Sequence, residues 1–178
     1  MIFHSTTLQG VYLIEPERID DHRGFFARTW CAEEFEAHGL STQTAQCSIS
    51  YNKNRGTLRG MHFQIDPKAE IKVVRCTAGA IYDVLLDLRM ESPSHLKWEA
   101  FELSSENRKL LYVPEGIAHG FQTLEDHTEV FYQISEFYSP EHSRGVLWND
   151  EAFGIEWPIA DPIVSDKDRS YPSYHSAP

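Results

Sequence analysis

Short runs with β-strand character, separated by turn signals at close intervals, are the feature of this sequence that most restricts its fold. The turn signals are Asn54-Arg55-Gly56, Thr77-Ala78-Gly79, Ser92-Pro93-Ser94, Ser104-Ser105-Glu106-Asn107, Pro114-Glu115-Gly116 and Ser139-Pro140. Strand-forming residues fill the stretches between them, at 72–76, 80–89, 96–103, 110–113 and 128–135. Many short strands between close turns are typical of a β-sandwich or β-barrel. The sequence therefore predicts an all-β fold.

The segment 80–89 has the alternation of a strand with two different faces. Successive side chains of a strand point to opposite sides, which groups Asp83, Leu85 and Asp87 on one face and Tyr82, Val84, Leu86 and Leu88 on the other. The one clear helix in the first half of the chain spans Ala32–His38 and ends at Gly39, a residue that suits a helix C-cap. We therefore expect low helix content.

Length and composition indicate one folded domain over residues 1–178. A chain of 178 residues with 41% hydrophobic residues can bury a sizeable core. The net charge of −11 argues against binding to nucleic acid, which requires a basic surface. The three cysteines, Cys31, Cys47 and Cys76, are few and odd in number, as in proteins of a reducing compartment. The sequence shows neither the pattern of a signal peptide nor an apolar run long enough to cross a membrane. We therefore expect a soluble cytoplasmic protein that does not bind a membrane.

Polar residues within the predicted strands point to a ligand cavity. A small barrel can hold one ligand in its mouth. The positions concerned are Lys72, Arg75, Asp83, Asp87, Arg89 and Tyr132. Alternation alone leaves open whether each of them faces the cavity or solvent. Tyr132 shares a face with apolar neighbours, so it is either a core residue or a general acid whose hydroxyl enters the cavity.

The densest group of candidate catalytic residues lies in Arg55–Gln64, which reads Arg-Gly-Thr-Leu-Arg-Gly-Met-His-Phe-Gln. Its two glycines predict tight bends that carry Arg59 and His62 into a site. A lone histidine is more often structural than catalytic. Arg59 and Lys72, however, supply donors for anionic oxygens close to His62, and this combination favours a base within a binding site.

A second group lies in Tyr112–Phe121, where the pattern Pro-x-Gly-x-x-His ends at His119. This pattern resembles the second conserved motif of cupins, whose metal-dependent members use the histidine as a ligand. The first cupin motif would require His-x-His, whereas this chain has His62-x-Gln64. Glutamine replaces imidazole poorly on a transition metal. A metal site of His62, His119 and Glu70 therefore stays open as an alternative.

Together these motifs resemble the dTDP-4-dehydrorhamnose 3,5-epimerase family over roughly residues 8–170. The matching stretches are 21–26, 46–50, 56–64, 72–89, 103–107, 113–121, 129–132, 137–140, 148–158 and 165–168. The resemblance implies a cupin-like jelly-roll barrel (a double-stranded β-helix) with a few short helices. It also implies a homodimer with an exchanged N-terminal strand, acting on a nucleotide sugar in dTDP-rhamnose biosynthesis. The reaction would be epimerisation at C3 and C5 of a dTDP-4-keto-6-deoxyhexose, with no cofactor and no metal, because the C4 ketone stabilises the carbanion.

The resemblance also assigns roles to individual residues. It implies His62 as the base, Asp168 as the carboxylate that orients it, Lys72 beside the C4 oxygen and Tyr132 as the acid. Taken from the residues alone, the segment Ser165–Asp168 reads only as a charged loop. The substrate-binding residues implied by the family are Arg23, Phe26, Gln46, Arg59, His119 and Tyr138.

Two departures and three alternatives accompany this interpretation. Many family members carry Glu where this chain has Arg28, and Asn where it has Ser48; both positions bear on nucleotide preference and leave the acid and the base unaffected. A single-carbon epimerase or a ketoisomerase would also use a base next to a ketone. A metal-dependent cupin and a non-catalytic sugar-nucleotide binder are the alternatives from other classes, and the joint presence of His62 and Tyr132 argues against the binder.

Overall fold

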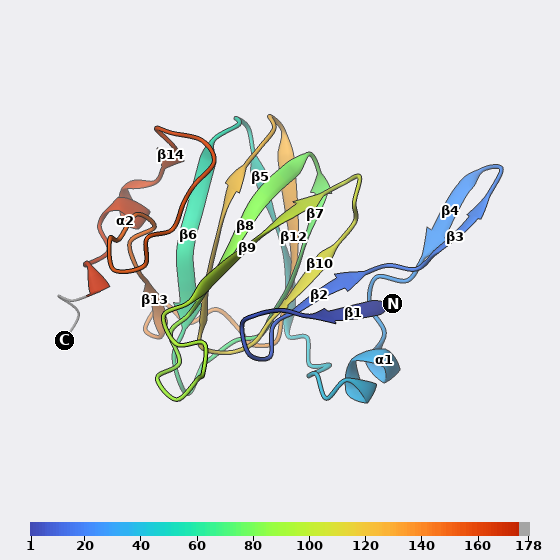
Figure 1. Cartoon of the computed structure of the whole chain (residues 1–178), viewed down its shortest axis with the longest axis horizontal. Helices are drawn as coiled ribbons and strands as arrows, with labels where there is room; N and C mark the ends of the chain where they lie inside the picture. Colours follow the sequence, from blue (N-terminus) through green and yellow to red (C-terminus); the bar gives the residue numbers. More distant parts are fainter. Residues whose placement is uncertain (175–178) are drawn as a thin grey trace.

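The computed structural model describes residues 1–174 and consists of two packed β-sheets with a projecting hairpin (Figure 1). The first sheet has the order β1 (Ile2–Ser5), β2 (Tyr12–Glu15), β10 (Leu110–Val113), β7 (Lys72–Ala78), β12 (Thr128–Ile134) and β5 (Gln46–Asn52). The second has the order β13 (Ser143–Gly145), β6 (Thr57–Gln64), β11 (Ile117–Thr123), β8 (Ala80–Asp87) and β9 (Trp98–Ser104). A short strand, β14 (Ile163–Val164), pairs with β6 in parallel, and β3 (Arg18–Asp21) and β4 (Gly24–Ala27) form the hairpin.

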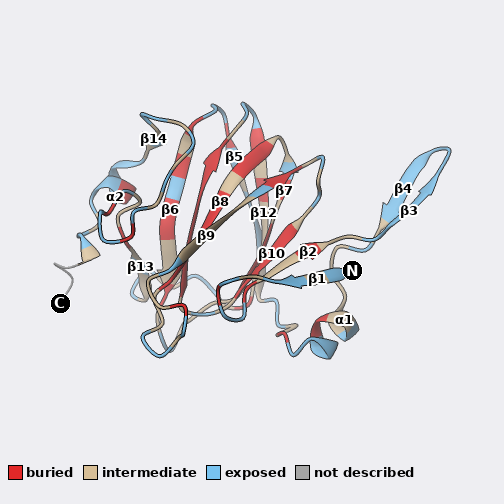
Figure 2. Ribbon diagram, in the orientation of Figure 1, coloured by how far each residue is buried: buried red, intermediate tan, exposed pale blue. Residues whose placement is uncertain are grey.

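The main core fills the space between the two sheets, where the strands are buried (Figure 2). Its largest buried cluster draws side chains from both sheets, among them Val74 and Leu111 of the first and Leu85 and Phe121 of the second. Burial of these apolar faces is the main term that stabilises the sandwich. The prediction of an all-β fold with few helices is confirmed.

Strand β8 confirms the alternation expected from the sequence. Leu85 belongs to the core between the sheets, whereas Val84 and Leu86 belong to a separate cluster with Val146 and Phe153 from the C-terminal part of the chain. This C-terminal cover explains why both faces of β8 are apolar. A strand in an ordinary two-layer sandwich would have one face exposed to solvent and one face buried in the core.

The two described helices are short, and one follows the hairpin while the other lies near the C-terminus. The first, α1 (Ala32–Ala37), has its C-cap at His38 and is followed by Gly39 at φ +71°, as the sequence predicts. The second, α2 (Asp166–Arg169), has Ser165 as its N-cap. Neither is long enough to span a bilayer, and none of residues 1–174 forms an apolar helix of that length.

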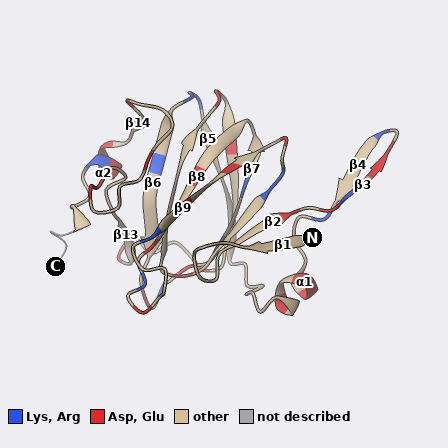
Figure 3. Ribbon diagram, viewed as in Figure 1, with Lys and Arg blue, Asp and Glu red and all other residues tan. Residues whose placement is uncertain are grey.

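The hairpin of β3 and β4 projects from the body of the protein at the end opposite β6 and α2 (Figure 1). Its apolar side chains include Ile19 and Phe26, which are 70% and 71% exposed. Charges of both signs are scattered over the strands and loops (Figure 3). Ile19 and Phe26 leave large apolar groups of the hairpin open to solvent within the single chain.

Candidate active site

A β-bulge in β6 places the two most polar residues of that strand on the same face. In the pairing of β6 with β11, His62 lies opposite His119 and Arg59 lies opposite Phe121. The two partners on β11 are two positions apart, whereas the two on β6 are three positions apart, so β6 carries one extra residue. His119 and Phe121 share a face, so Arg59 and His62 share it as well. Regular alternation would have placed them on opposite faces.

Gly60 permits this bulge. It has φ +136°, and a Cβ at this position would lie 2.5 Å from the Cα of Gly120 on β11. The sequence predicted that the glycines flanking Arg59 form bends. Gly56 does so in the turn before β6, whereas Gly60 lies inside the strand, where the two backbones approach closely. This difference matters because the close approach, and not a chain reversal, directs His62 to the inner face.

His62 and Asp168 form a hydrogen-bonded pair. The distance from His62 Nε2 to Asp168 Oδ1 is 2.6 Å, and Asp168 is 4% exposed, although the His62 side chain is 38% exposed. The capping hydroxyl of Ser165 accepts a hydrogen bond from the Asp168 backbone N–H and so fixes the start of α2. An ionised carboxylate only accepts hydrogen bonds, so Nε2 carries the proton and Nδ1 is left as the basic atom.

The environment of Asp168 favours its ionised form. Burial opposes ionisation, but the hydrogen bond and positive charge of His62, with a further hydrogen bond from the Gly60 N–H, lower the pKa of Asp168 below its ordinary value. A carboxylate that stays ionised next to an imidazole stabilises the imidazolium that forms when the ring accepts a proton.

Lys72 lies on β7, in the same rung of the first sheet as Gln46 of β5. Ile134 of β12 pairs with both of them, so the three side chains point to the same side. The Lys72 ammonium is nearly buried, donates to the carbonyl of His62 at 3.2 Å and lies 3.0 Å from Glu70 Oε1. These contacts fix a positive charge next to the His62 backbone, which is the electrostatic feature needed for an anionic oxygen in the cavity.

A second histidine–carboxylate pair lies deeper in the sandwich. His119 Nε2 is 2.8 Å from Asp83 Oδ2, and both residues are buried. Burial raises the pKa of Asp83, against the opposing charges of His119 and Lys72. The ring of Tyr132 lies 6.1 Å from that of His119 in an edge-to-face arrangement. Burial, and next the charge of Asp83, raise the pKa of Tyr132, so its hydroxyl carries a proton at neutral pH.

A cavity of about 210 Å³ joins His62 and Lys72. Its other lining residues are Gln46, Phe63, Gln64, Glu70, Ile134, Tyr138, Ser143 and Lys167. Ligand cavities of proteins usually have about 300–1,000 Å³. The volume within one chain therefore suits a single sugar ring and is too small for a whole nucleotide sugar.

The described chain brings most, but not all, of the expected site residues together. The cavity includes His62, Lys72, Gln46 and Tyr138, with Asp168 behind the imidazole. His119 and Tyr132 lie next to it, and Arg59, whose Nε donates to Asn52 Oδ1 at 2.8 Å, lies on the same face of β6 as His62. Arg23 and Phe26 lie on the distant hairpin (Figure 1), where Arg23 is paired with Asp21 and 78% exposed.

The three side chains considered for a metal site have other partners. His62 is bonded to Asp168, His119 to Asp83, and Glu70 to Lys72. Gln64 is held by backbone groups: its amide nitrogen donates to the Lys68 and Phe137 carbonyls, and its oxygen accepts from the Ser139 N–H. Within residues 1–174, no three His, Cys, Asp or Glu side chains converge as a metal site would require.

Three polar residues of the site, Asp83, Lys167 and Ser143, carry no assignment from the sequence. Asp83 was recognised only as a polar strand position, although a carboxylate on the inner face of an apolar strand is itself a signal of function. Lys167 stands within the matched stretch 165–168 and lines the cavity. Ser143 belongs to β13, a strand of only three residues, too short for periodicity to reveal.

Comparisons with known proteins agree with this geometry. The family model described as dTDP-4-dehydrorhamnose 3,5-epimerase matches residues 5–176. A relative of that name from Sinorhizobium fredii is 42% identical, over 100% of this chain and 92% of its own length. The crystal structure of the Bacillus anthracis enzyme with TDP and pyrophosphate bound has a TM-score of 0.93 and 44% identity, covering 97% of this chain and 98% of that one.

A third structure links the same fold to a sugar ligand. The Legionella pneumophila dTDP-6-deoxy-D-glucose-3,5-epimerase, in complex with dTDP-4-keto-L-rhamnose, has a TM-score of 0.88 and 31% identity, covering 96% of this chain and 90% of that one. These likenesses confirm the cupin-like jelly roll expected from the sequence. By sequence, fold and family model alike, the chain belongs to the dTDP-4-dehydrorhamnose 3,5-epimerase family.

Proposed function

We propose that this protein epimerises C3 and C5 of dTDP-4-dehydro-6-deoxy-D-glucose to give dTDP-4-dehydro-L-rhamnose. The observation that carries the proposal is a carboxylate-bound imidazole and a nearly buried ammonium that line one sugar-sized cavity, with a protonated tyrosine next to it on β12. This arrangement supplies a base, an oxyanion partner and an acid. Family membership over almost the whole chain supports the same reaction.

In the proposed mechanism, His62 removes a proton next to the C4 ketone. Nδ1 is the accepting atom because Nε2 donates to Asp168. Asp168 holds the plane of the ring and stabilises the imidazolium, a role that requires an ionised carboxylate. The product of this step is an enolate whose negative charge is shared with the C4 oxygen.

Lys72 is the proposed partner of that oxygen, with His119 close by. Its ammonium lies at the base of the cavity and is fixed by Glu70 and the His62 carbonyl, so little reorganisation is needed when charge develops. Loss of one such donor typically costs about 3–4 kcal/mol of transition-state stabilisation. The protein thus needs no cofactor for this step, because the substrate ketone delocalises the charge.

Tyr132 is the proposed acid that returns a proton from the opposite side of the sugar. It lies on β12 of the first sheet, whereas His62 lies on β6 of the second, so the two groups approach the space between the sheets from different sides. Its raised pKa keeps the proton on the hydroxyl until the enolate is present. Inversion requires such a second group, because a single base would return the proton to the face from which it came.

We further infer that the working unit is a homodimer. Gln46 and Tyr138 line the cavity, and Arg59 lies on the same face of β6 as His62, so these three would contact the diphosphate and nucleoside. Arg23 and Phe26 belong to the hairpin that projects away from the cavity (Figure 1). A hairpin from a second copy would supply both, and would extend a cavity that is too small for the whole nucleotide sugar. The three free thiols fit a cytoplasmic location, where thiols stay reduced.

The test is incubation of the protein with dTDP-4-keto-6-deoxyglucose in heavy water, followed by mass spectrometry of the sugar. Two deuterons per sugar, one at C3 and one at C5, are expected for the proposed reaction. One deuteron would indicate a single-carbon epimerase or a ketoisomerase instead. No incorporation would refute the proposed activity on this substrate, and bound metal would then be measured to examine the metal-dependent alternative.

A further inference from the structure

The position next to His62 in the second sheet is empty of a side chain. His62 pairs with His119 of β11 on one side and with Gly145 of β13 on the other. Residues that face each other across an antiparallel pair have neighbouring side chains on the same face. His119 therefore supports the imidazole on one side. On the other side Gly145 has no side chain, so β13 gives the imidazole no neighbouring side chain.

The ring of Tyr171 occupies this empty place. A Cβ on Gly145 would lie within 2.7 Å of three atoms of the Tyr171 ring, so the ring packs directly on the glycine backbone. Gly145 has no positive φ that would itself require glycine, so the close approach of the ring is the constraint at this position. The same ring meets His62 edge to face, with centroids 5.9 Å apart and planes at 64°.

Tyr171 and Asp168 hold the imidazole at two different points. Asp168 bonds one atom, Nε2, at 2.6 Å, and a single hydrogen bond leaves the ring free to tilt about that contact. Tyr171 follows Asp168 by three residues and touches a different side of the ring. One short segment after β14 therefore supplies both the hydrogen bond and the packing surface that set the direction of Nδ1.

The aromatic ring, and not the hydroxyl, makes this contact. The Tyr171 hydroxyl is buried and has no hydrogen-bond partner among the described residues. Burial raises the pKa of Tyr171 and outweighs the nearby Lys167, which lowers it, so the hydroxyl stays neutral. A buried hydroxyl with no partner at hydrogen-bond distance contributes little to stability, and its removal should cost little.

We propose that Tyr171, packed on Gly145, is a positioning residue that holds the His62 imidazole in the orientation needed for proton abstraction. This inference rests on the proposed function of His62 as the base. Partners that orient metal-ligating side chains typically contribute about 10–100-fold to metal affinity or activity, and a misplacement of about 1 Å at a reacting centre can cost about 100-fold. We expect an effect of the same order for Tyr171.

The test compares four variants by kcat and KM for dTDP-4-keto-6-deoxyglucose and by dTDP affinity in calorimetry. Tyr171→Ala removes the ring, Gly145→Ala displaces it while leaving Tyr171 in the chain, and Tyr171→Phe removes only the hydroxyl. Tyr82→Ala is the matched control, because the Tyr82 ring also packs edge to face on an aromatic residue of the C-terminal segment, Trp157, away from His62.

Tyr171→Ala and Gly145→Ala are expected to lower kcat by about 10–100-fold with dTDP affinity within about 3-fold of the wild type. Tyr171→Phe and Tyr82→Ala should retain kcat within about 3-fold. Unchanged kcat in both ring variants, or an equal loss in Tyr171→Phe, would overturn the proposal. A loss confined to KM would also overturn it, because it would place Tyr171 in substrate binding.

A spectroscopic measurement separates this inference from the proposed function. In protein labelled with ¹⁵N-histidine, the imidazole signals of His62, assigned by their loss in His62→Asn, should shift or broaden in Tyr171→Ala and stay in place in Tyr171→Phe. This result is independent of turnover, so it can support the positioning role even if the wild type is inactive on the chosen sugar. Unchanged His62 signals in Tyr171→Ala would refute the positioning role even if the enzyme is active.

Discussion

His62 and Tyr132 have different electrostatic surroundings, and the difference suits their proposed roles. The His62 imidazole is part-exposed at the cavity and is bonded to an ionised carboxylate, which orients the ring. Tyr132 is partly buried, and burial and the charge of Asp83 raise its pKa, so its hydroxyl keeps its proton. A carboxylate-bound imidazole and a protonated hydroxyl are the two kinds of group that acid–base catalysis requires.

Substitution of these two residues should therefore cause different failures. His62→Asn is expected to abolish exchange of the C3 and C5 hydrogens with heavy water, because no base remains to form the enolate. Tyr132→Phe is expected to retain exchange while losing net epimerisation by about 100-fold or more, since general-acid catalysis typically contributes about 10²–10⁴-fold. Mass spectrometry measures the exchange, and proton NMR of the sugar measures the epimerisation.

Two results would contradict these roles. Full exchange in His62→Asn would require another base, and full epimerisation in Tyr132→Phe would require another acid. Tyr12→Phe is a suitable control for the second variant, because Tyr12 lies on β2, packs in the peripheral cluster around Phe35 and does not line the cavity. It should match the wild type in both measurements.

At the residue scale, the sequence pointed to residues that the structure brings together, but not to their contacts. His62, Lys72 and Tyr132 stand in stretches that resemble the family, and the structure brings them together. Asp168 could be paired with His62 only through that resemblance, because more than a hundred residues separate them in the chain. The sequence did not point to Tyr171. Its contact with His62 depends on the missing side chain of Gly145, which lies on another element.

At the element scale, turn spacing and alternation predicted the central strands but could not predict the bulge in β6. The expected strand at 80–89 corresponds to β8, and its two faces enter separate clusters as expected. Gly60 is compatible with a bend, a bulge or a close approach, and only the neighbouring Gly120 of β11 decides between them. Strand pairing is a long-range property, so local sequence did not reveal it.

The last residue of β8, Asp87, is a buried carboxylate that joins the following turn to the N-terminal segment. Asp87 accepts hydrogen bonds from Arg89, Ser92 and Ser94. Arg89 also donates to the Gln9 carbonyl, and Ser94 accepts from the Gln9 N–H. Burial opposes ionisation of Asp87, but the hydrogen bonds from Arg89, Ser92 and Ser94 outweigh it and lower its pKa. This carboxylate thus connects elements that are far apart in the sequence.

Asp87→Asn is expected to lower the free energy of unfolding near neutral pH by about 3 kcal/mol, as is typical when one partner of a buried ion pair is removed. Because the pKa of Asp87 is lower in the folded protein, its stabilising effect is complete above the unfolded value of about 3.9. It is lost as the pH falls below that value toward the folded pKa. Urea denaturation at several pH values should therefore show the two proteins converging below about pH 4.

The matched control for this measurement is Glu91→Gln, in the same turn. Glu91 is exposed, so its substitution should change stability by less than about 0.5 kcal/mol at every pH. A difference between Asp87→Asn and the wild type that stays constant down to pH 2 would show that the charge of Asp87 does not stabilise the fold.

At the scale of the whole molecule, the two ends of the chain serve the site in different ways. The C-terminal segment pairs β14 with β6 and brings Asp168 to the imidazole of its own chain. The N-terminal hairpin points away from that site and leaves Arg23 and Phe26 exposed. This arrangement is the basis of the homodimer that we propose, in which a second copy supplies Arg23 and Phe26.

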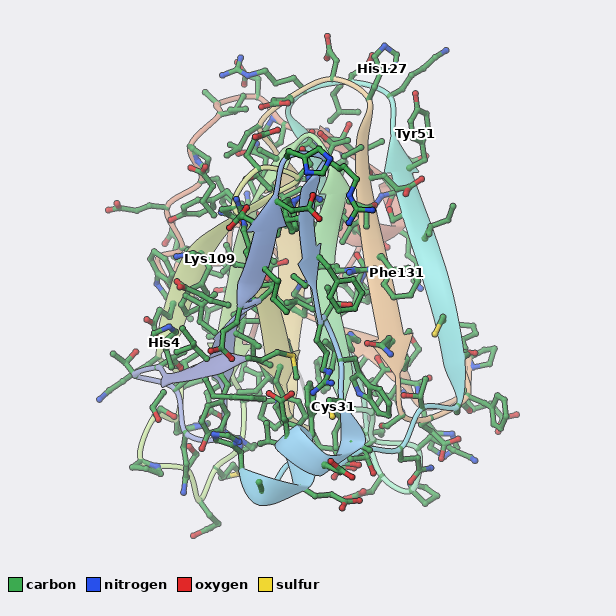
Figure 4. All side chains as sticks on the ribbon, turned by 90° about the vertical axis from the view of Figure 1, so that its right-hand side faces the viewer. His4, Cys31, Tyr51, Lys109, His127 and Phe131 are labelled. Carbon is green, nitrogen blue, oxygen red and sulfur yellow. The ribbon has the colours of Figure 1, made fainter. Side chains whose placement is uncertain are left out.

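The outer face of the first sheet offers a surface for that second copy. Figure 4 views the molecule from this side, with Tyr51 and Phe131 on the strands β5 and β12. Phe131 pairs across the sheet with Ile49 on one side and Arg75 on the other. Ile49 and Tyr51 are 64% and 53% exposed, which is unusual for large apolar side chains on one strand. An apolar face of this kind, beside a projecting hairpin, suits a symmetric homodimer.

A mixed-dimer experiment tests this arrangement directly. His62→Asn and Arg23→Ala are each expected to reduce activity strongly when purified alone. In a dimer of one chain of each kind, one site receives an intact His62 from its own chain and an intact Arg23 from the other. Random mixing by co-expression or refolding should therefore restore about a quarter of wild-type activity, since half of the dimers are mixed and each has one intact site.

The control mixture is His62→Asn with Lys72→Ala. Both residues line the cavity of one chain, so no arrangement of two such chains contains an intact site. Recovery in the first mixture but not in the second would place Arg23 in the partner's site. No recovery in either, with dimers confirmed by light scattering, would mean that each hairpin serves its own chain. The hairpin would then have to fold back across the body of the protein to bring Arg23 to the cavity.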